Sequence, residues 1–364
     1  MAAGGKALVI SSYFSIFFLY FYDGPFWMIM EYRSPFQKNL LKSVLTLGAA
    51  GFFFFFFMFP AAGQPVPAKV ENIPHLVTFG NKAETSWGDD DYCNIFFFIV
   101  PKSYHDPFYI RVYDPDTGGE IDELDGVFDT RTEFSVYGGE GCWTDDIDPS
   151  GTFRNGNMLA SRIFDGSSQY DAKWYTFGPF NPTEGEFAEE FQGYIFKIIV
   201  LGVDGDDGNL YNFYLSTSPD QNLPIEGGDA FTYEYGFRLW NDTVNISHIY
   251  PYVDNRVVSI KQTNFDWDSD GEIRTVTVAR LYQLNKVSGE DEWAESEFKI
   301  VDKEKNTSFD FQFIKKKDPM VRNNNVVISV RNQYGELLPF HTVPIGGVPK
   351  FQYGAAAKPI RKKR

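Results

Sequence analysis

The sequence contains few of the residues from which common active sites and metal centres are built. Only two cysteines and four histidines occur among 364 residues. Neither cysteine lies in a C-x-x-C arrangement, and no two histidines have the spacing of metal ligands: His75, His105, His248 and His341. The patterns G-x-S-x-G, P-loop and G-x-G-x-x-G are also absent. The sequence therefore gives no support to a zinc site, a nucleophilic hydrolase or a nucleotide-binding enzyme.

Positive charge is scarce over most of the chain. The formal net charge is −16, and residues 64–357 alone carry 24 basic and 47 acidic side chains. A body this acidic repels phosphate backbones, which argues against nucleic-acid binding and favours divalent cations or basic partners. The last seven residues, KPIRKKR, are basic instead. We expect this tail either to be solvated or to dock on an acidic face of another copy or on an anionic envelope polymer.

Long apolar runs occur only before residue 64. Basic residues Arg33, Lys38 and Lys42 precede an apolar core at residues 43–59, and Ala61-Ala62-Gly63 follows. This order predicts a cleaved signal peptide and a secreted, extracellular or cell-surface protein. The alternative is a membrane anchor, since about 20 apolar residues span a bilayer. An earlier apolar run, residues 7–30, is either a first membrane span or translated upstream DNA.

The two cysteines both follow the predicted signal. In an oxidising compartment, Cys93 and Cys142 are expected to form a disulfide, which would close a loop of about fifty residues and contribute roughly 4 kcal/mol. The alternative is two buried thiols. Export of the chain favours the disulfide over two buried thiols.

Aromatic residues make up 18% of the chain, and they gather in short runs with β-branched residues. Asp, Gly, Pro and Asn separate these runs, and no helical periodicity is sustained. We therefore predict an all-β protein with two tandem β-sandwich domains, the first jelly-roll-like and the second immunoglobulin-like. The expected parts are 1–63 (signal or anchor), 64–92 (linker or extended segment), 93–222 (first domain), 223–350 (second domain) and 351–364 (basic tail).

One stretch resembles a known family. The run FYIRVYDPDTGGEI, followed later by KWYTFGPF, is similar to the strand and Asp-turn pattern of small β-sandwich modules of secreted bacterial proteins, of the pre-peptidase C-terminal type. The resemblance covers about a third of the chain. It implies surface attachment or passive binding and supplies no catalytic residues.

Three loops combine Asp with Gly: DPDTGG (114–119), DGDDGN (204–209) and DWDSDGEI (266–273). Such loops either turn the chain between strands or bind calcium. In the third, Asp266, Asp268 and Asp270 match positions 1, 3 and 5 of a calcium loop, and Glu272 offers a backbone carbonyl at position 7. Thr277 stands where an EF-hand has Glu. We therefore expect a Ca²⁺ site at the third loop that draws a further carboxylate from elsewhere, and turns at the first two.

These features favour a non-catalytic structural or adhesive protein of the cell exterior. Its expected partners are further copies of itself, as an oligomer or polymer, or envelope polysaccharide, and an uncleaved N-terminal segment is its only expected membrane contact. The alternative is a protein that binds or cleaves glycans, with a sugar-stacking platform made by Trp143, Trp174 and Trp267.

Overall fold

The computed structural model describes residues 7–12, 15–20, 65–84, 92–145, 151–316, 324–342 and 344–346. Two of these segments, β1 (Ala7–Ser12) and β2 (Ser15–Tyr20), pair as an antiparallel hairpin within a unit formed by residues 1–59. Most of the predicted signal or anchor, and all of the basic tail, lie outside the described residues and stay predictions. The remaining strands belong to a second unit, residues 60–364.

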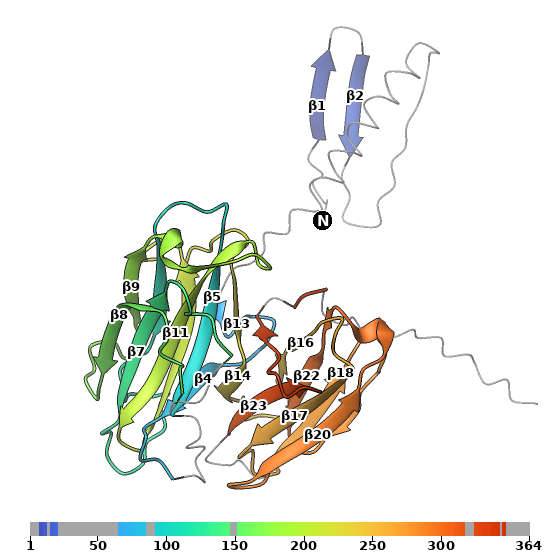
Figure 1. Cartoon of the computed structure of the whole chain (residues 1–364). Coiled ribbons are helices and arrows are strands. Elements are labelled where there is room, and N and C mark those ends of the chain that lie inside the picture. The colour runs from blue at the N-terminus through green and yellow to red at the C-terminus, as the bar shows by residue number, and fades with distance from the viewer. Residues whose placement is uncertain are drawn as a thin grey trace, which may run out of the picture. The chain divides into compact units, whose positions relative to one another are not determined.

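The first sheet of this second unit has seven antiparallel strands (Figure 1). They are β5 (Cys93–Pro101), β7 (Arg131–Gly138), β8 (Asn157–Phe164), β10 (Glu186–Ala188), β11 (Gly193–Asp204), β13 (Asp229–Thr232) and β24 (Phe340–His341). The order across the sheet is β24-β13-β5-β11-β7-β8, and β10 also pairs with β11.

The second sheet has nine strands. They are β3 (Pro65–Val66), β4 (His75–Phe79), β6 (Phe108–Tyr113), β9 (Trp174–Phe180), β12 (Gly208–Ser216), β14 (Glu234–Arg238), β17 (Ser259–Phe265), β20 (Trp293–Lys299) and β23 (Asn325–Asn332). The order is β20-β17-β23-β14-β4-β12-β6-β9, and β3 also pairs with β12.

Two smaller sheets and two short 3₁₀ turns complete the described fold. The four-stranded sheet contains β15 (Ile246–Ile249), β18 (Gly271–Val276), β19 (Gln283–Asn285) and β22 (Asp310–Lys315), in the order β15-β22-β18-β19. The strands β16 (Tyr252–Val253) and β21 (Thr307–Ser308) form a pair, and the 3₁₀ turns are η3 (Pro182–Glu184) and η4 (Asp302–Glu304). All recorded strand pairs are antiparallel, so the all-β prediction is confirmed for the described residues.

The strand sequences explain where each strand lies. In β5, CNIFFFIVP, every residue except the last is buried, and the strand pairs with β11 on one side and β13 on the other. A strand covered on both faces reads as a continuous apolar run. In β17, SIKQTNF, buried and half-buried residues mostly alternate, because side chains along a strand point to opposite faces. Aromatic and β-branched residues fit such pleated, half-buried surfaces.

β4 joins two groups of strands that the sequence led us to expect in separate domains. It pairs with β12 from Leu76 to Phe79, and with β14 through Leu76 opposite Phe237 and His75 opposite Arg238. The nine-stranded sheet is therefore continuous from β9 to β20. Residues 64–92, which we interpreted as a linker or extended segment, supply an interior strand of this sheet.

The boundary predicted at residue 223 is also not a break in the sheets. β13 and β24 both follow it in sequence, yet β13 pairs with β5 of the first group and β24 pairs with β13. The antiparallel sheets pair in the manner of sandwiches, and both large sheets contain strands from before and after residue 223.

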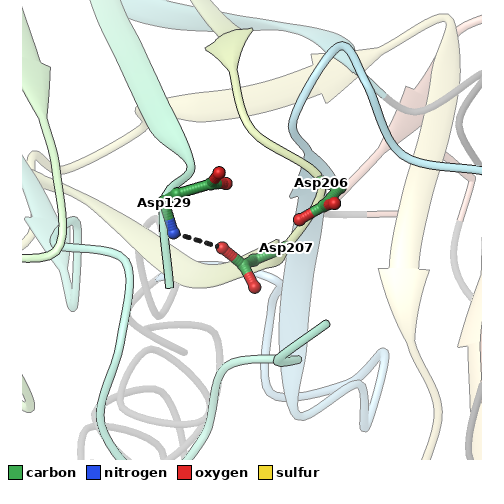
Figure 2. Close-up of side chains that lie close together, drawn as sticks. All are labelled: Asp129, Asp206 and Asp207. Carbon is green, nitrogen blue, oxygen red and sulfur yellow. Dashed lines mark hydrogen bonds between the residues drawn. The ribbon is translucent and has the colours of Figure 1, made fainter. Parts of the chain in front are cut away.

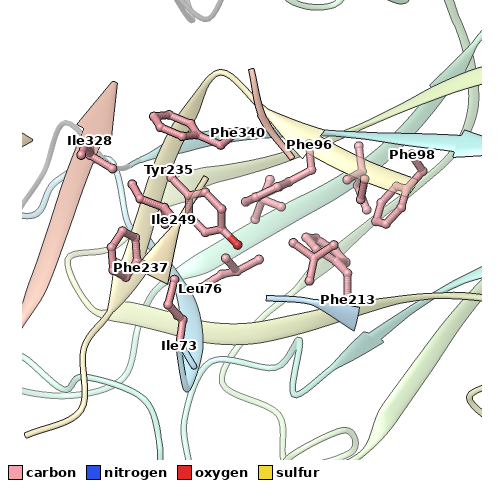
Figure 3. Close-up of a cluster of buried hydrophobic side chains, with 14 of the residues drawn as sticks. Ile73, Leu76, Phe96, Phe98, Phe213, Tyr235, Phe237, Ile249, Ile328 and Phe340 are labelled. Atoms are coloured by element: carbon pink, nitrogen blue, oxygen red, sulfur yellow. The ribbon is translucent and has the colours of Figure 1, made fainter. Parts of the chain in front are cut away.

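One buried core extends through both groups of strands (Figure 3). Phe96 of β5 packs on Phe213 of β12, with ring centroids 5.5 Å apart, and also on Tyr235 of β14 at 6.0 Å. Tyr235 in turn meets Phe237 edge to face at 5.4 Å. Leu76 of β4 lies among these rings and is fully buried. A shared core of this kind makes the two groups cooperative in folding.

A carboxyl group is buried beside this core. Glu71 lies in the turn between β3 and β4, with no exposed surface. Its Oε2 accepts hydrogen bonds from the Ala68 amide and, at 3.2 Å, from the Tyr235 hydroxyl, whereas its Oε1 has no hydrogen-bond partner among the described residues. Burial raises the pKa of Glu71 from 4.5 to about 8. The side chain is therefore neutral in the folded protein at pH 7.

Glu71 predicts a measurable dependence of stability on pH. The folded protein keeps this proton up to a pH of about 8, whereas the unfolded chain releases it near 4.5. Between these values, the free energy of unfolding falls as the pH rises, by up to about 1.4 kcal/mol per pH unit. Glu71→Gln keeps an oxygen for the Ala68 amide but cannot ionise. Urea denaturation at several values between pH 5 and 8 should show a shallower fall for this variant than for the wild type.

Glu226 provides the matched control, because the same chemical change, Glu to Gln, is made there at an exposed position. Glu226→Gln should keep the wild-type slope. Equal slopes for the wild type and Glu71→Gln would contradict the assignment of this proton to Glu71.

Candidate functional site

The three Asp/Gly loops connect strands or follow them in the structure. Residues 114–119 follow β6, residues 204–209 form the turn between β11 and β12, and residues 266–273 connect β17 to β18. Each of the three loops therefore lies at the end of a strand, where the turn interpretation places it. The three loops differ in the groups that neutralise or bind their carboxylates.

The second loop forms the strongest candidate metal site. Asp206 and Asp207 of the β11–β12 turn lie beside Asp129, which precedes β7 (Figure 2). One carboxylate oxygen from each of the three residues lies within 4.8 Å of the others. Asp129 is exposed, Asp206 half-buried and Asp207 buried. This cluster could hold a metal ion, with one side open to solvent.

Asp207 fixes the geometry of the cluster. Its Oδ1 accepts a hydrogen bond from the Asp125 amide at 2.9 Å, and its Oδ2 accepts from the amides of Asp129 at 2.8 Å and Thr130 at 3.1 Å. Its own amide donates to the Thr130 hydroxyl at 2.7 Å. A carboxylate has about four acceptor positions, so one remains after these three bonds. Asp207 thus clamps the two loops together and still has capacity for an ion.

A glycine permits this close contact. Gly205 has a φ of +84°, which favours glycine, and a Cβ at this position would lie 2.3 Å from the Thr130 Cα. No side chain fits there without moving the backbone. The turn therefore holds Asp206 and Asp207 against the residues before β7.

Electrostatic repulsion remains within the cluster. Burial first, and then repulsion from Asp129 and Asp207, raises the pKa of the Asp206 carboxyl above its usual value. The nearby Lys82 ammonium lies 2.5 Å from Asp204, but its side chain is 67% exposed. A solvated ammonium offsets little of the repulsion among the three carboxylates. A divalent cation bound between them would relieve it.

The third loop, where we predicted calcium, has a different arrangement. The Lys315 ammonium contacts the Asp270 carboxylate, and both side chains are buried. The Glu272 side chain pairs with Arg274 at 2.5 Å, whereas the predicted ligand was its backbone carbonyl, which belongs to β18 opposite Ile314. A cationic group of the protein thus already lies where an ion at Asp270 would bind.

The other two predicted ligands, Asp266 and Asp268, stay close together, with Glu290 near both, but among the described residues they do not form a group of three close enough to share an ion. Asp266 Oδ1 accepts a hydrogen bond from the Asp291 amide at 2.8 Å. Burial, and then repulsion that includes Asp268, raises the pKa of Asp266 to about 7. The spacing of Asp266, Asp268 and Asp270 therefore did not reveal Lys315, which is 45 positions after Asp270 and reaches it only through the pairing of β18 with β22.

The first loop is a turn stabilised by its own carboxylates. Asp114 Oδ1 accepts from the Ala172 amide at 3.0 Å, and Asp116 Oδ2 accepts from the Ser167 hydroxyl at 3.0 Å and from the Tyr170 amide. Burial raises the pKa of Asp114 to about 6. These bonds tie the loop to residues 167–172, as Asp does in many turns.

The structure shows no disulfide between the two cysteines. Both are buried, and the Cys142 Sγ lies 3.3 Å from the carbonyl oxygen of Ile195. The strand register pairs Ile195 with Ile99 but Leu201 with Cys93, which puts the two thiols about 20 Å apart along β5. A disulfide needs Cα atoms within about 7 Å of each other. The predicted bond between Cys93 and Cys142 is therefore incompatible with this strand register.

The tryptophans proposed for a sugar-stacking platform do not gather on one surface. Trp267 is 1% exposed and belongs to the core. Trp143 packs on Phe191 and donates a hydrogen bond to Tyr233, whereas Trp174 packs on Tyr113. None of the three contacts another of the three.

Comparison with known protein families found no family model that matches the chain, and comparison with curated proteins found no significant sequence match. Among the described residues, no helix has both the length and the apolar character needed to cross a bilayer. The functional argument therefore rests on the geometry of the sites.

The clamp formed by Asp207 predicts a loss of stability when its carboxylate is removed. Asp207→Ala leaves the amides of Asp125, Asp129 and Thr130 without this acceptor, and each buried unsatisfied donor costs about 1–3 kcal/mol. We expect the free energy of unfolding to fall by about 2–4 kcal/mol in chelator-containing buffer, measured by urea denaturation.

Asp206→Ala is the matched control, because the Asp206 carboxylate accepts no hydrogen bond from another residue in the described part of the chain. It should change the free energy of unfolding by less than about 1 kcal/mol. If both variants lost the same stability, Asp207 would not be the clamp.

Proposed function

We propose that the protein is a secreted or cell-surface structural or adhesive protein without catalytic activity, and that calcium stabilises it at Asp129, Asp206 and Asp207. The acidic cluster is the observation that carries this proposal. It draws carboxylates from two loops that are distant in sequence, and those loops are held in place by Asp207 whether or not an ion is bound.

Calcium suits this cluster better than other common cations. Calcium binds oxygen ligands at about 2.3–2.6 Å, so oxygens within 4.8 Å of one another can share one ion. Among the described residues, the cluster contains no histidine or cysteine. Zinc and copper prefer these ligands, so both metals are disfavoured here. Magnesium requires shorter bonds and nearly octahedral geometry. Water would supply the remaining calcium ligands on the exposed side.

The open side of the cluster indicates weak binding. Asp129 is exposed, and Asp207 divides its oxygens between the ion and three backbone amides. Extracellular calcium modules bind with dissociation constants of about 10⁻⁴–10⁻³ M. Binding of this strength is useful where calcium is abundant, which supports the location outside the cell that residues 33–63 predict.

The charge of the protein bears on its partners. Residues 64–357 carry a net charge of −23, so copies repel one another unless cations or basic segments intervene. Calcium, and the basic tail of residues 358–364, would both reduce this repulsion. We therefore propose further copies of the chain, or envelope polysaccharide, as partners. The finer division into jelly-roll-like and immunoglobulin-like sandwiches belongs to the same proposal.

Calcium should raise the thermal stability of the purified protein. At about 5 mM calcium, a site of the expected strength contributes about 1–2 kcal/mol, which raises Tm by roughly 2–5 °C. The paired changes Asp129→Asn and Asp206→Asn should abolish this rise and leave the fold intact, because the Asp207 clamp remains. Differential scanning calorimetry with calcium, magnesium or chelator measures the effect.

Asp268→Asn distinguishes the two calcium hypotheses. It alters the loop at residues 266–273 and leaves the cluster at Asp129 untouched, so its calcium-dependent rise should equal that of the wild type. A rise that persists without Asp129 and Asp206 but disappears in Asp268→Asn would place the ion in the other loop. No rise in the wild type would remove calcium from the proposed function.

A further inference from the structure

Lys315 and Asp270 form an unusual buried contact. Lys315 is the last residue of β22, and Asp270 directly precedes β18. The register sets Lys315 opposite Gly271, and the Lys316 amide donates to the Asp270 carbonyl at 2.8 Å. Lys315 is 6% exposed and Asp270 is 4% exposed. The backbones thus hold the amino group directly against the carboxyl group.

The surroundings of this contact exclude water. Trp267 is 1% exposed, and its ring packs on Phe313 with centroids 5.5 Å apart. Gly271 admits the indole, since a Cβ there would lie 2.3 Å from Trp267. Among the described residues, the Lys315 Nζ also donates to the side-chain oxygen of Asn324, at 3.4 Å. That oxygen is shared with the Trp267 indole N–H, also at 3.4 Å.

A second carboxyl group stands nearby. Asp268 lies two residues before Asp270, and its Oδ1 is buried with no hydrogen-bond partner among the described residues. Burial, and then repulsion from Glu290, raises the pKa of Asp268, while the Lys315 charge opposes that rise. Burial also lowers the pKa of Lys315. Among the described residues, the buried Asp268 oxygen without a partner is the group placed to accept a proton from the ammonium.

A buried ion pair is costly to maintain, because both charges lose their hydration. An amide bond between the same two groups carries no charge and loses little on burial. The site therefore brings together an amine, a carboxyl group and a second carboxyl group that can exchange protons, in a place from which water is excluded. Such an arrangement promotes reaction between groups held in contact.

We propose that Lys315 and Asp270 form an intramolecular isopeptide bond. The Lys315 Nζ attacks the Asp270 Cγ, a C–N bond forms, and a C–O bond of the carboxyl group breaks. One ammonium and one carboxylate give one amide and one water molecule, so atoms and charge balance without an oxidant or a cofactor. Asp268 passes two protons in turn from the nitrogen to the departing oxygen, one before attack and one after the C–N bond forms, so that this oxygen leaves as water.

The bond would join two neighbouring strands of the four-stranded sheet. It links the start of β18 to the end of β22 and closes the chain between residues 270 and 315. A covalent link restricts the unfolded chain and keeps the strands together under load. This inference is independent of calcium binding and of the location of the protein.

Intact-mass spectrometry of the purified, denatured and reduced full-length protein tests the proposal. The wild type should be lighter than its amino-acid sequence requires by one water molecule, about 18 Da. Asp270→Ala and Lys315→Arg should each show the full mass of their own sequence. Lys316→Arg is the matched control, because the Lys316 Nζ donates to the Ser269 carbonyl oxygen at 2.9 Å and takes no part in the reaction. It should retain the loss of water.

Peptide mapping locates the bond. Digestion of the wild type should give a branched peptide that joins the segments around residues 270 and 315, with no tryptic cleavage after Lys315. Asp268→Asn keeps both reacting groups, and the fraction of protein with the bond should fall at least about tenfold at equal times after synthesis, as expected on removal of a proton-transfer group. Loss of the bond should lower Tm by more than about 5 °C.

Two results would overturn the proposal. Full sequence mass in the folded wild type would show that the contact is only an ion pair. Loss of ammonia in place of water, with a branch at Asn324, would show that the lysine reacts with the neighbouring amide and not with Asp270. Both measurements on the wild type hold even if a variant fails to fold.

Discussion

The pairing of Leu76 with Phe237 is the contact on which the rest of the structure depends. Through it, β4 connects strands formed by residues 65–216 to strands formed after residue 234. The shared aromatic core lies against this junction, and the turn that carries Glu71 lies just before it. The β11–β12 turn, which carries Asp206 and Asp207, leads into β12, and β12 pairs with β4 directly. A change at β4 therefore acts on both groups of strands.

Burial of carboxyl groups is the second constraint on the structure. The chain has 49 acidic and 33 basic residues, and the described residues accommodate buried carboxyl groups in several ways. Glu71 keeps its proton, Asp207 accepts three backbone amides, and Asp270 contacts Lys315. Similar Asp/Gly loops thus acquire different chemistry because different groups pack against them. The sequence of each loop determines that the chain turns there, and the residues that pack against the loop determine which groups its carboxylates contact.

The sequence predicted local structure well and distant contacts poorly. The short aromatic and β-branched runs between turn residues are a local signal of strands, and those at residues 94–101 and 209–216 form most of β5 and β12. The role of residues 75–79 was missed, because their partners in β14 lie about 160 positions away. For the same reason, the spacing within 266–273 indicated a calcium loop but not Lys315. Asp129 carried no signal of its own, because a single Asp before a strand is common.

The positions of the two cysteines explain why other links between strands would help to stabilise the protein. Cys93 and Cys142 line the same buried cluster but lie too far apart to bridge, and burial raises the pKa of Cys142 to about 12, so its thiol is unreactive. In the location outside the cell that we propose, a chain whose two thiols are not joined to each other would have to resist unfolding by other means. The proposed calcium ion would tie the β11–β12 turn to the residues before β7, and the proposed amide would tie β18 to β22. Each group of strands would then carry one link, and the continuous nine-stranded sheet would connect the two.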